Sequence, residues 1–260
     1  MTRIAPKKAL GQHFLVDRNV LGVIKRLARL APDDVVLEVG PGLGVLTSFL
    51  ADRVSHVHAI ELDRSLDEPL RAALGGRGNV SLVYDDALAV DIARLAPTPT
   101  KLVANLPYNV ATPLVAETLT AGRPLEFWCV MVQREVADRF FAEPGTKAYG
   151  AVSVLVRLHA HRTGFHPVSR TVFRPPPNVD SALVAFERIP RPPDSERVLR
   201  VVTGAFAHRR KTLANSLALA GLASREATVE ALAAIGRAPD VRAEALQPEE
   251  FVRLAQALAA

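Results

Sequence analysis

Short apolar runs alternate with longer amphipathic stretches over the first two thirds of the chain. The runs expected to form strands are rich in β-branched residues and cover 35–39, 57–60, 80–83, 102–104, 127–131, 152–158 and 182–186. Between them apolar residues recur at every third or fourth position, which predicts helices over 20–30, 44–53, 64–74, 112–121 and 133–141. This alternation is typical of βαβ units, so we expect an α/β fold with a mostly parallel, seven-stranded sheet and an antiparallel hairpin at its edge.

Two proline-rich stretches divide the rest of the chain. The first, Phe-Arg-Pro-Pro-Pro-Asn at 173–178, cannot lie inside a helix or a central strand and is predicted to be a loop. The second, at 189–194, precedes a tail rich in Ala, Leu and Arg that has no strand signal. We therefore expect one domain over 1–190 and a small all-α domain over 191–260, with four short helices that break near Gly221, Gly236 and Pro248.

The composition narrows the class of protein. With 260 residues, of which 49% are hydrophobic, the chain can bury a large core, and disorder as its main state is excluded. A net charge of +5 favours a polyanionic partner, either nucleic acid or an anionic membrane surface. The single cysteine, Cys129, excludes an internal disulfide framework and a zinc site with two thiolates. With no targeting segment and no bilayer-length apolar stretch, we expect a soluble cytoplasmic protein.

A glycine-rich loop follows the first strong strand. The sequence Glu38-Val39-Gly40-Pro41-Gly42-Leu43-Gly44 opens a predicted helix, and its alternate glycines allow the backbone to approach a ligand closely. A dinucleotide loop would need glycine at 45 or 47, where the chain has Val45 and Thr47, so NAD is disfavoured. The loop lacks the Gly-Lys-Ser/Thr ending of a P-loop. A tight turn without a ligand is the alternative interpretation.

Acidic residues follow the next two strands. Glu61 ends the second strand, where a carboxylate can accept hydrogen bonds from both ribose hydroxyls. Asp63 is expected to cap the helix that begins near Arg64. Asp85 and Asp86 end the third strand, where one can accept from an adenine amino group and the other can cap the turn.

The tetrapeptide Asn105-Leu106-Pro107-Tyr108 after the fourth strand carries the most specific chemistry. The lone pair of an exocyclic amine is delocalised into its ring. The side-chain oxygen of Asn105 and a backbone carbonyl can accept its two N–H groups and so localise that lone pair, while Tyr108 stacks on the base. A turn without a catalytic role is the alternative.

These motifs, in this order and at these spacings, resemble S-adenosylmethionine-dependent class I methyltransferases that act on adenine N6. Further segments, at 11–15, 133–137, 147–150, 173–181 and 205–213, extend the resemblance over nearly the whole chain to the rRNA adenine N6-methyltransferase family, and within it to the enzymes that dimethylate 16S rRNA. The resemblance implies a Rossmann-like fold and two methylations on each of two adjacent adenosines near the 3′ end of 16S rRNA in the 30S subunit or its precursor. It also implies a role in subunit biogenesis.

The resemblance also implies roles for individual residues. Cofactor-binding residues are expected at His13, Leu15, Gly40, Gly42, Glu61, Asp86 and Asn105, and residues at the reaction site are expected at Asn105, Leu106, Pro107, Tyr108 and Phe173. Phe173 matches an aromatic residue that stacks on the target base opposite Tyr108. His13 departs from the asparagine common in the family. Imidazole can still donate one hydrogen bond, so we expect the contact to survive, and pH-sensitive cofactor binding through the charge of His13 is a hypothesis.

Basic residues near the start of the chain and in its tail are candidates for RNA contact. Arg209, Arg210 and Lys211 in the tail, and Arg3, Lys7 and Lys8 near the start, can neutralise RNA phosphates, although such a charge run is also typical of a solvated face. We expect a monomer with no metal and no membrane contact. A 23S rRNA adenine methyltransferase and a non-catalytic 30S assembly factor remain as alternatives.

Overall fold

The computed structural model describes residues 12–120 and 124–259, which form two compact units. The first unit runs up to Ala137 and includes Arg162–Arg188, and the second combines Asp138–His161 with the chain from Ile189 onward. No helix in the described residues combines the length and the apolar character needed to cross a membrane.

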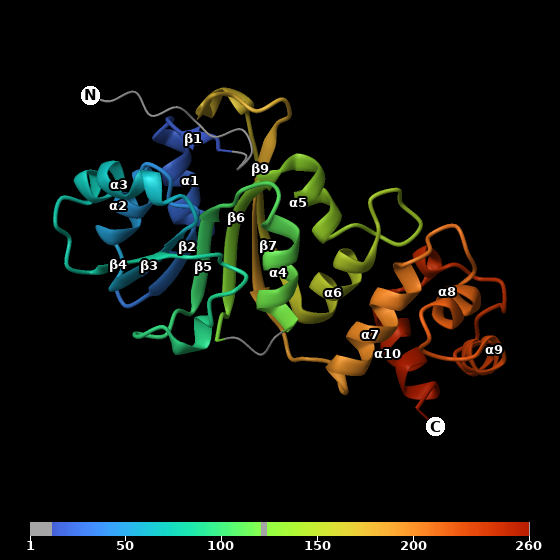
Figure 1. The fold of residues 1–260 in the computed structure, drawn as a ribbon. Coiled ribbons are helices and arrows are strands. Elements are labelled where there is room, and N and C mark those ends of the chain that lie inside the picture. Colours follow the sequence, from blue (N-terminus) through green and yellow to red (C-terminus); the bar gives the residue numbers. More distant parts are fainter. Residues whose placement is uncertain (1–11, 121–123, 260) are drawn as a thin grey trace. The chain divides into compact units, whose positions relative to one another are not determined.

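A seven-stranded sheet forms the centre of the first unit (Figure 1). Its strands lie in the order β4 (Val80–Tyr84), β3 (His56–Glu61), β2 (Val35–Val39), β5 (Lys101–Asn105), β6 (Phe127–Gln133), β9 (Ser181–Arg188) and β7 (Ala160–Val168). The pairs among β4, β3, β2, β5 and β6 are parallel, and β9 runs antiparallel to β6. The predicted mostly parallel sheet is therefore confirmed.

Helices precede, connect and follow the parallel strands. α2 (Val45–Ala51), α3 (Asp67–Leu74) and α4 (Ala111–Thr120) each lie between two of these strands, while α1 (Asn19–Leu27) precedes β2 and α5 (Arg134–Phe140) follows β6. All of these helices lie close to the predicted ranges. Residue 121 of the predicted fourth helix lies outside the described residues. β6 is almost wholly buried, as its continuous apolar run predicts. Cys129 in this strand is fully buried, and burial raises the pKa of its thiol to about 12. A free cysteine in such a setting acts as a small apolar core residue.

A two-stranded ribbon lies apart from the main sheet. It pairs β1 (Phe14–Leu15) with β8 (Phe173–Arg174) in antiparallel fashion, so Phe14 lies opposite Arg174 and Leu15 lies opposite Phe173. The predicted loop at 173–178 thus begins as a short strand and continues through three prolines.

The prediction of a strand over 152–158 is wrong. This segment is the helix α6 (Ala151–His159), and the seventh strand is the next segment, β7. Val152, Val154, Leu155, Val156 and Leu158 are all buried, so apolar residues surround this helix. Periodicity cannot separate such a buried helix from a buried strand.

The second unit is helical. It contains α6, α7 (Ser195–Phe206), α8 (Leu213–Leu219), α9 (Arg225–Ala234) and α10 (Pro248–Ala257), and the four predicted tail helices are confirmed. The observed division after Arg188 lies close to the predicted boundary at residue 190, but residues 138–161 group with the helical unit and not with the first domain. The reason is one shared core in which Tyr149 and Leu155 pack with Val201 and Phe251.

We predict that Tyr149→Phe lowers the free energy of unfolding by about 1–2 kcal/mol, because a buried carbonyl loses its partner. Tyr149 is fully buried, and its hydroxyl donates a 2.7 Å hydrogen bond to the carbonyl of Leu246. Urea unfolding measures the change. Tyr108→Phe is the comparison, since that side chain is only partly buried and its hydroxyl bonds to the Ser181 hydroxyl at 2.9 Å. Equal stability of Tyr149→Phe and the unchanged protein would contradict the prediction.

Candidate active site

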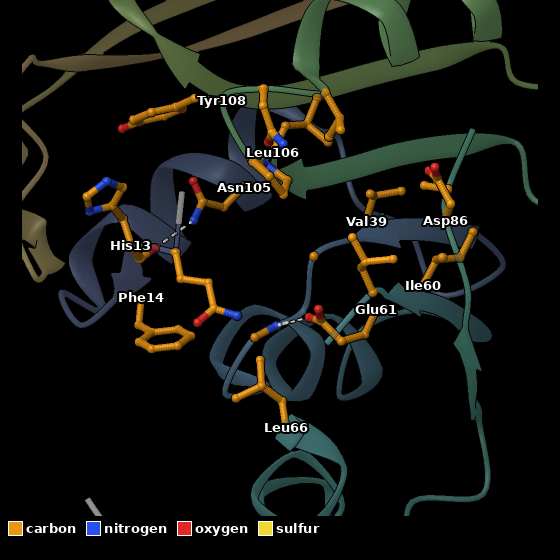
Figure 2. Close-up of a pocket in the computed structure, with 18 of the residues that line it drawn as sticks. His13, Phe14, Val39, Ile60, Glu61, Leu66, Asp86, Asn105, Leu106 and Tyr108 are labelled. Carbon is orange, nitrogen blue, oxygen red and sulfur yellow. Dashed lines mark hydrogen bonds between the residues drawn. The ribbon is translucent and has the colours of Figure 1, made fainter. Parts of the chain in front are cut away.

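The carboxyl ends of the parallel strands meet at one edge of the sheet and line a cavity (Figure 2). Its empty volume is about 810 Å³, with its solvent-open mouth included. The lining residues are Gln12, His13, Phe14, Val39, Gly40, Gly42, Ile60, Glu61, Leu62, Leu66, Asp85, Asp86, Ala87, Asn105, Leu106, Pro107, Tyr108, Asn109 and Val110. Most of the predicted site residues are therefore brought together.

The glycine loop passes directly beside the Asn105–Tyr108 turn. Gly40 has a φ of +75°, and a Cβ there would lie 3.1 Å from two ring carbons of Pro107. Gly42 has a φ of +57°, and a Cβ there would lie 3.1 Å from the ring of Phe14. A side chain at either position would be strained and crowded. Glycine therefore allows these segments to close around the cavity.

Backbone groups hold the carboxylate of Glu61 in place. The N–H of Gly42 donates to one oxygen at 3.1 Å, and the N–H of Asp63 donates to the other at 2.8 Å. The side chain is buried at the floor of the cavity. Each oxygen keeps a second lone pair, so the carboxylate can accept two more hydrogen bonds. Asp63 caps the following turn by accepting from the N–H of Ser65 at 3.0 Å, as predicted.

The amide of Asn105 has a defined orientation. Its Nδ2 donates to the backbone carbonyl of His13 at 3.3 Å, as Figure 2 shows. Because a carbonyl can only accept, this hydrogen bond leaves the Oδ1 atom of Asn105 as the acceptor available to a ligand. The amide can thus receive an N–H donor without first turning.

Tyr108 completes this end of the cavity. Its hydroxyl shares a 2.9 Å hydrogen bond with the Ser181 hydroxyl, and burial raises its pKa. Its ring centroid lies 5.6 Å from that of His13. Leu106 is buried beneath the turn, while Pro107 packs on Gly40. Ser181 therefore fixes the hydroxyl end of Tyr108, and the ring of Tyr108 lies next to the ring of His13.

The other end of the cavity is acidic. Asp86 accepts from the N–H of Leu88 at 2.9 Å, and Asp85 accepts from the N–H of Asp86 at 2.8 Å. Both aspartates thus take part in the turn after β4. Leu62, which sequence reasoning missed, lines the same region although 57% of its surface is exposed. An apolar residue directly after a strand-end carboxylate is the signal that could have identified it.

The segment before β1 closes the cavity from a third direction. Gln12 donates to Asp63 at 2.9 Å, and Nδ1 of His13 lies 2.8 Å from the carbonyl of Pro175. The ring of Phe14 lies against Gly42. Gln12 and Phe14 belong to a motif of the sequence but were not predicted as site residues, because only the tertiary structure brings them to the cavity.

Two residues predicted for the cofactor and reaction sites do not line the cavity. The side chain of Phe173 is only 2% exposed, belongs to the core cluster of the first unit and does not line the cavity. Its expected stacking on a base is therefore not supported by this arrangement, because its place in the β1–β8 ribbon turns the ring inward. Leu15, its partner in the ribbon, is also buried and lines only a smaller neighbouring hollow.

The predicted phosphate-binding residues of the tail lie in the second unit between α7 and α8. Arg209 donates to the carbonyl of Tyr149 at 3.1 Å and lies 3.8 Å from the carboxylate of Glu244, so its guanidinium has a structural role. Arg210 and Lys211 are exposed. The basic residues Arg3, Lys7 and Lys8 lie outside the described residues.

A buried carboxylate lies below the glycine loop. Glu38 at the end of β2 is 1% exposed, and its Oε2 has no hydrogen-bond partner within residues 12–120 and 124–259. Burial, with a smaller contribution from the nearby Glu61, raises the pKa of Glu38 to about 8. In the described part of the chain, no three His, Cys, Asp or Glu side chains gather closely enough to hold a metal ion.

Comparisons with known proteins agree on one family. The family model described as ribosomal RNA adenine dimethylase matches residues 4–260. The ribosomal RNA small subunit methyltransferase A of Rubrobacter xylanophilus is 49% identical over 96% of this chain and 94% of its own length. The protein of that name from Kineococcus radiotolerans is 47% identical over 97% of this chain and 86% of its own length.

Solved structures show the same fold. A dimethyladenosine transferase from Plasmodium falciparum has a TM-score of 0.73 and 24% identity, and the match covers 93% of this chain and 96% of that one. The 23S rRNA methyltransferase ErmE has a TM-score of 0.68 and 30% identity, and the match covers 95% of this chain and all of that one.

We predict that Glu38 contributes stability that is lost between about pH 4.5 and 8, and that Glu38→Gln removes this contribution. The pKa of Glu38 is raised in the folded state, so folding favours the protonated acid; its contribution is full below pH 4.5 and is lost as the pH rises through about 8. Urea unfolding at pH 5, 6.5 and 8.5 measures the slope. Glu230→Gln, at an exposed site on α9, is the control. A pH slope of Glu38→Gln equal to that of the unchanged protein would contradict the prediction.

Proposed function

The chain belongs to the ribosomal RNA adenine dimethylase family, and from this premise we propose that it dimethylates N6 of two adjacent adenosines in the 3′-terminal hairpin loop of 16S rRNA. The substrate in this proposal is the 30S subunit or its precursor, and the reaction takes place in the cytoplasm during subunit biogenesis.

Family membership establishes the enzyme class and the cofactor. The chain is an S-adenosylmethionine-dependent adenine dimethyltransferase that acts on ribosomal RNA, with a class I methyltransferase fold. The expected family, fold class, enzyme class and cofactor are thereby confirmed. The individual site residues and the exact adenosines remain part of the proposal.

The cavity has the features that S-adenosylmethionine requires. Glycines at 40 and 42 keep the space over the loop free of side chains. We assign Glu61 to the ribose hydroxyls, because both of its oxygens are oriented and each keeps a lone pair. Oδ1 of Asp86 already accepts a backbone N–H, and we assign its Oδ2 to an adenine amino group. When bound, the cofactor supplies an electrophilic methyl group on a sulfonium centre.

The orientation of the Asn105 amide is the observation that carries the mechanism. Its Nδ2 is engaged by the carbonyl of His13, so Oδ1 accepts an N–H of the target amine. Accepting this N–H localises the lone pair of N6 for attack, and the fixed dipole needs no reorganisation during the reaction. Asn105 acts through position and is not a base, since the N6 proton becomes acidic once the amine is methylated.

The ring of Tyr108 offers a face for the target base. Its hydroxyl is held by Ser181, and stacking on an aromatic face is tolerant of the base that stacks. A base must leave its neighbours to reach such a cavity, which an unpaired hairpin loop permits at low cost. Leu106 supports the turn from the core, and Pro107 sets its distance from the glycine loop.

The choice of the small-subunit RNA rests on the degree of similarity. The relatives at 47–49% identity carry a small-subunit name, while the 23S rRNA enzyme is 30% identical. Leu106 also stands where the 23S enzymes usually have isoleucine. The 23S substrate and the non-catalytic assembly factor are therefore the outcomes that the experiment must separate.

We predict that the protein transfers labelled methyl groups from S-adenosylmethionine to unmethylated 30S particles and forms N6,N6-dimethyladenosine. Asn105→Ala should reduce the rate at least about a hundredfold, because the lone pair of N6 is no longer localised. Asn19→Ala, at an exposed position on α1, is the matched control and should keep full activity. Label on 50S particles would assign the enzyme to 23S rRNA, and 30S binding without transfer would indicate an assembly factor.

We predict that Gly40→Ala lowers the affinity for S-adenosylmethionine more than about tenfold, since its Cβ would meet the Pro107 ring at 3.1 Å and displace the loop. Gly76→Ala is the matched control. Gly76 has the same φ of +75°, but a Cβ there would have nothing within 4 Å. Calorimetric titration measures both affinities, and equal loss in the two variants would attribute the effect to backbone strain alone.

A further inference from the structure

Arg174 of the first unit lies next to the wall of the cavity, and Arg170 precedes it by four residues. Arg174 is in β8, directly opposite Phe14, whose ring lines the cavity. The carbonyl of the next residue, Pro175, lies 2.8 Å from Nδ1 of His13. Arg174 therefore pairs with Phe14 of the cavity wall, and its chain neighbour Pro175 contacts His13 of the same wall.

Strand geometry turns the Arg174 side chain away from the core. Successive side chains of a strand point to opposite sides. Phe173 is buried, and Arg174 is accordingly exposed. Arg170, at the start of the preceding turn, is also exposed, and its backbone N–H is anchored by Asp180 at 3.0 Å. Neither guanidinium forms an ion pair or hydrogen bond within the residues that the structure describes.

The backbone that carries Arg174 is restrained. β1 pairs with β8 on one side, and prolines occupy positions 175, 176 and 177 on the other. Proline has a fixed φ, so this segment loses little conformational freedom when a ligand binds. The backbone that carries the Arg174 guanidinium is therefore already in position before a ligand binds.

The charges along the cavity are asymmetric. Asp85 and Asp86 line one end, and Figure 2 shows Asp86 on the opposite side of the view from His13. These carboxylates repel phosphate groups and suit a cationic cofactor. The β1–β8 ribbon at the other end carries the exposed positive charge of Arg174. An RNA strand that delivers a base to the cavity is thus repelled from the cofactor end and attracted to the ribbon.

We infer that Arg174, assisted by Arg170, binds the sugar–phosphate backbone next to the adenosine that enters the cavity. The inference rests on the proposed function and adds an RNA contact in the catalytic unit to the basic cluster of the tail. A guanidinium presents a planar pair of donors that matches two phosphate oxygens. Phosphate contacts set the register of a nucleic acid without reading its sequence, so these arginines position the loop strand.

Binding measurements at several salt concentrations test this contact. A labelled RNA hairpin with the 3′-terminal small-subunit loop is titrated with the protein and with Arg174→Gln, Arg174→Lys and Arg170→Gln/Arg174→Gln. Each lost phosphate contact should reduce the slope of log affinity against log salt by about 0.7–0.9. Arg174→Lys keeps the charge and should keep the slope. Arg94→Gln is the control, since Arg94 is exposed and pairs with Asp91 at 3.1 Å.

Kinetics on small-subunit particles give the second measurement. Arg174→Gln should raise KM for the particle about threefold or more, and it should leave kcat and the affinity for S-adenosylmethionine unchanged. Unchanged slope and KM in the double variant would overturn the inference. If the unchanged protein methylates only large-subunit RNA, the proposed substrate is wrong. The salt slopes are then measured on that RNA, and they decide the role of the arginines independently.

Discussion

The close contact between Gly40 and Pro107 is the constraint on which the site depends. β2 and β5 are neighbours and parallel, so the turns after them leave the sheet at the same edge. Those turns can approach only because position 40 has no side chain, since a Cβ would lie 3.1 Å from the proline ring. This approach brings the glycine loop beside the amide of Asn105. A transfer reaction between two ligands requires such proximity.

Most polar groups of the site are held by groups that take no part in the chemistry. Two backbone N–H groups orient Glu61, the carbonyl of His13 orients Asn105, and Ser181 holds Tyr108. A fixed polar group needs little reorganisation when charge shifts during a reaction. These contacts come from segments before β1, after β2, after β3 and at the start of β9, so parts of the first unit that are distant in sequence build one site.

Electrostatics divide the cavity into two functional ends. Asp85 and Asp86 after β4 place negative charge at one end, while the ribbon of β1 and β8 carries the exposed Arg174. The buried Glu38 adds a group that is protonated over much of the neutral range, because its environment cannot solvate a charge. A cationic cofactor and a polyanionic RNA can thus approach the same cavity from different sides.

The sequence by itself determined the order of most strands and helices, the glycine loop, the strand-end acids and the Asn105–Tyr108 turn, because these depend on local periodicity and on the residues directly after each strand. Tertiary structure alone decided three other features. The segment 152–158 is a buried helix, and Val154, Leu155 and Leu158 pack in the helical core of the second unit. Phe173 does not line the cavity, because its pairing with Leu15 in the ribbon places its side chain in the core. Gln12 and Phe14 line the cavity because they contact Asp63 and Gly42, which are distant from them in sequence. Long-range packing and pairing have no signature in local sequence spacing.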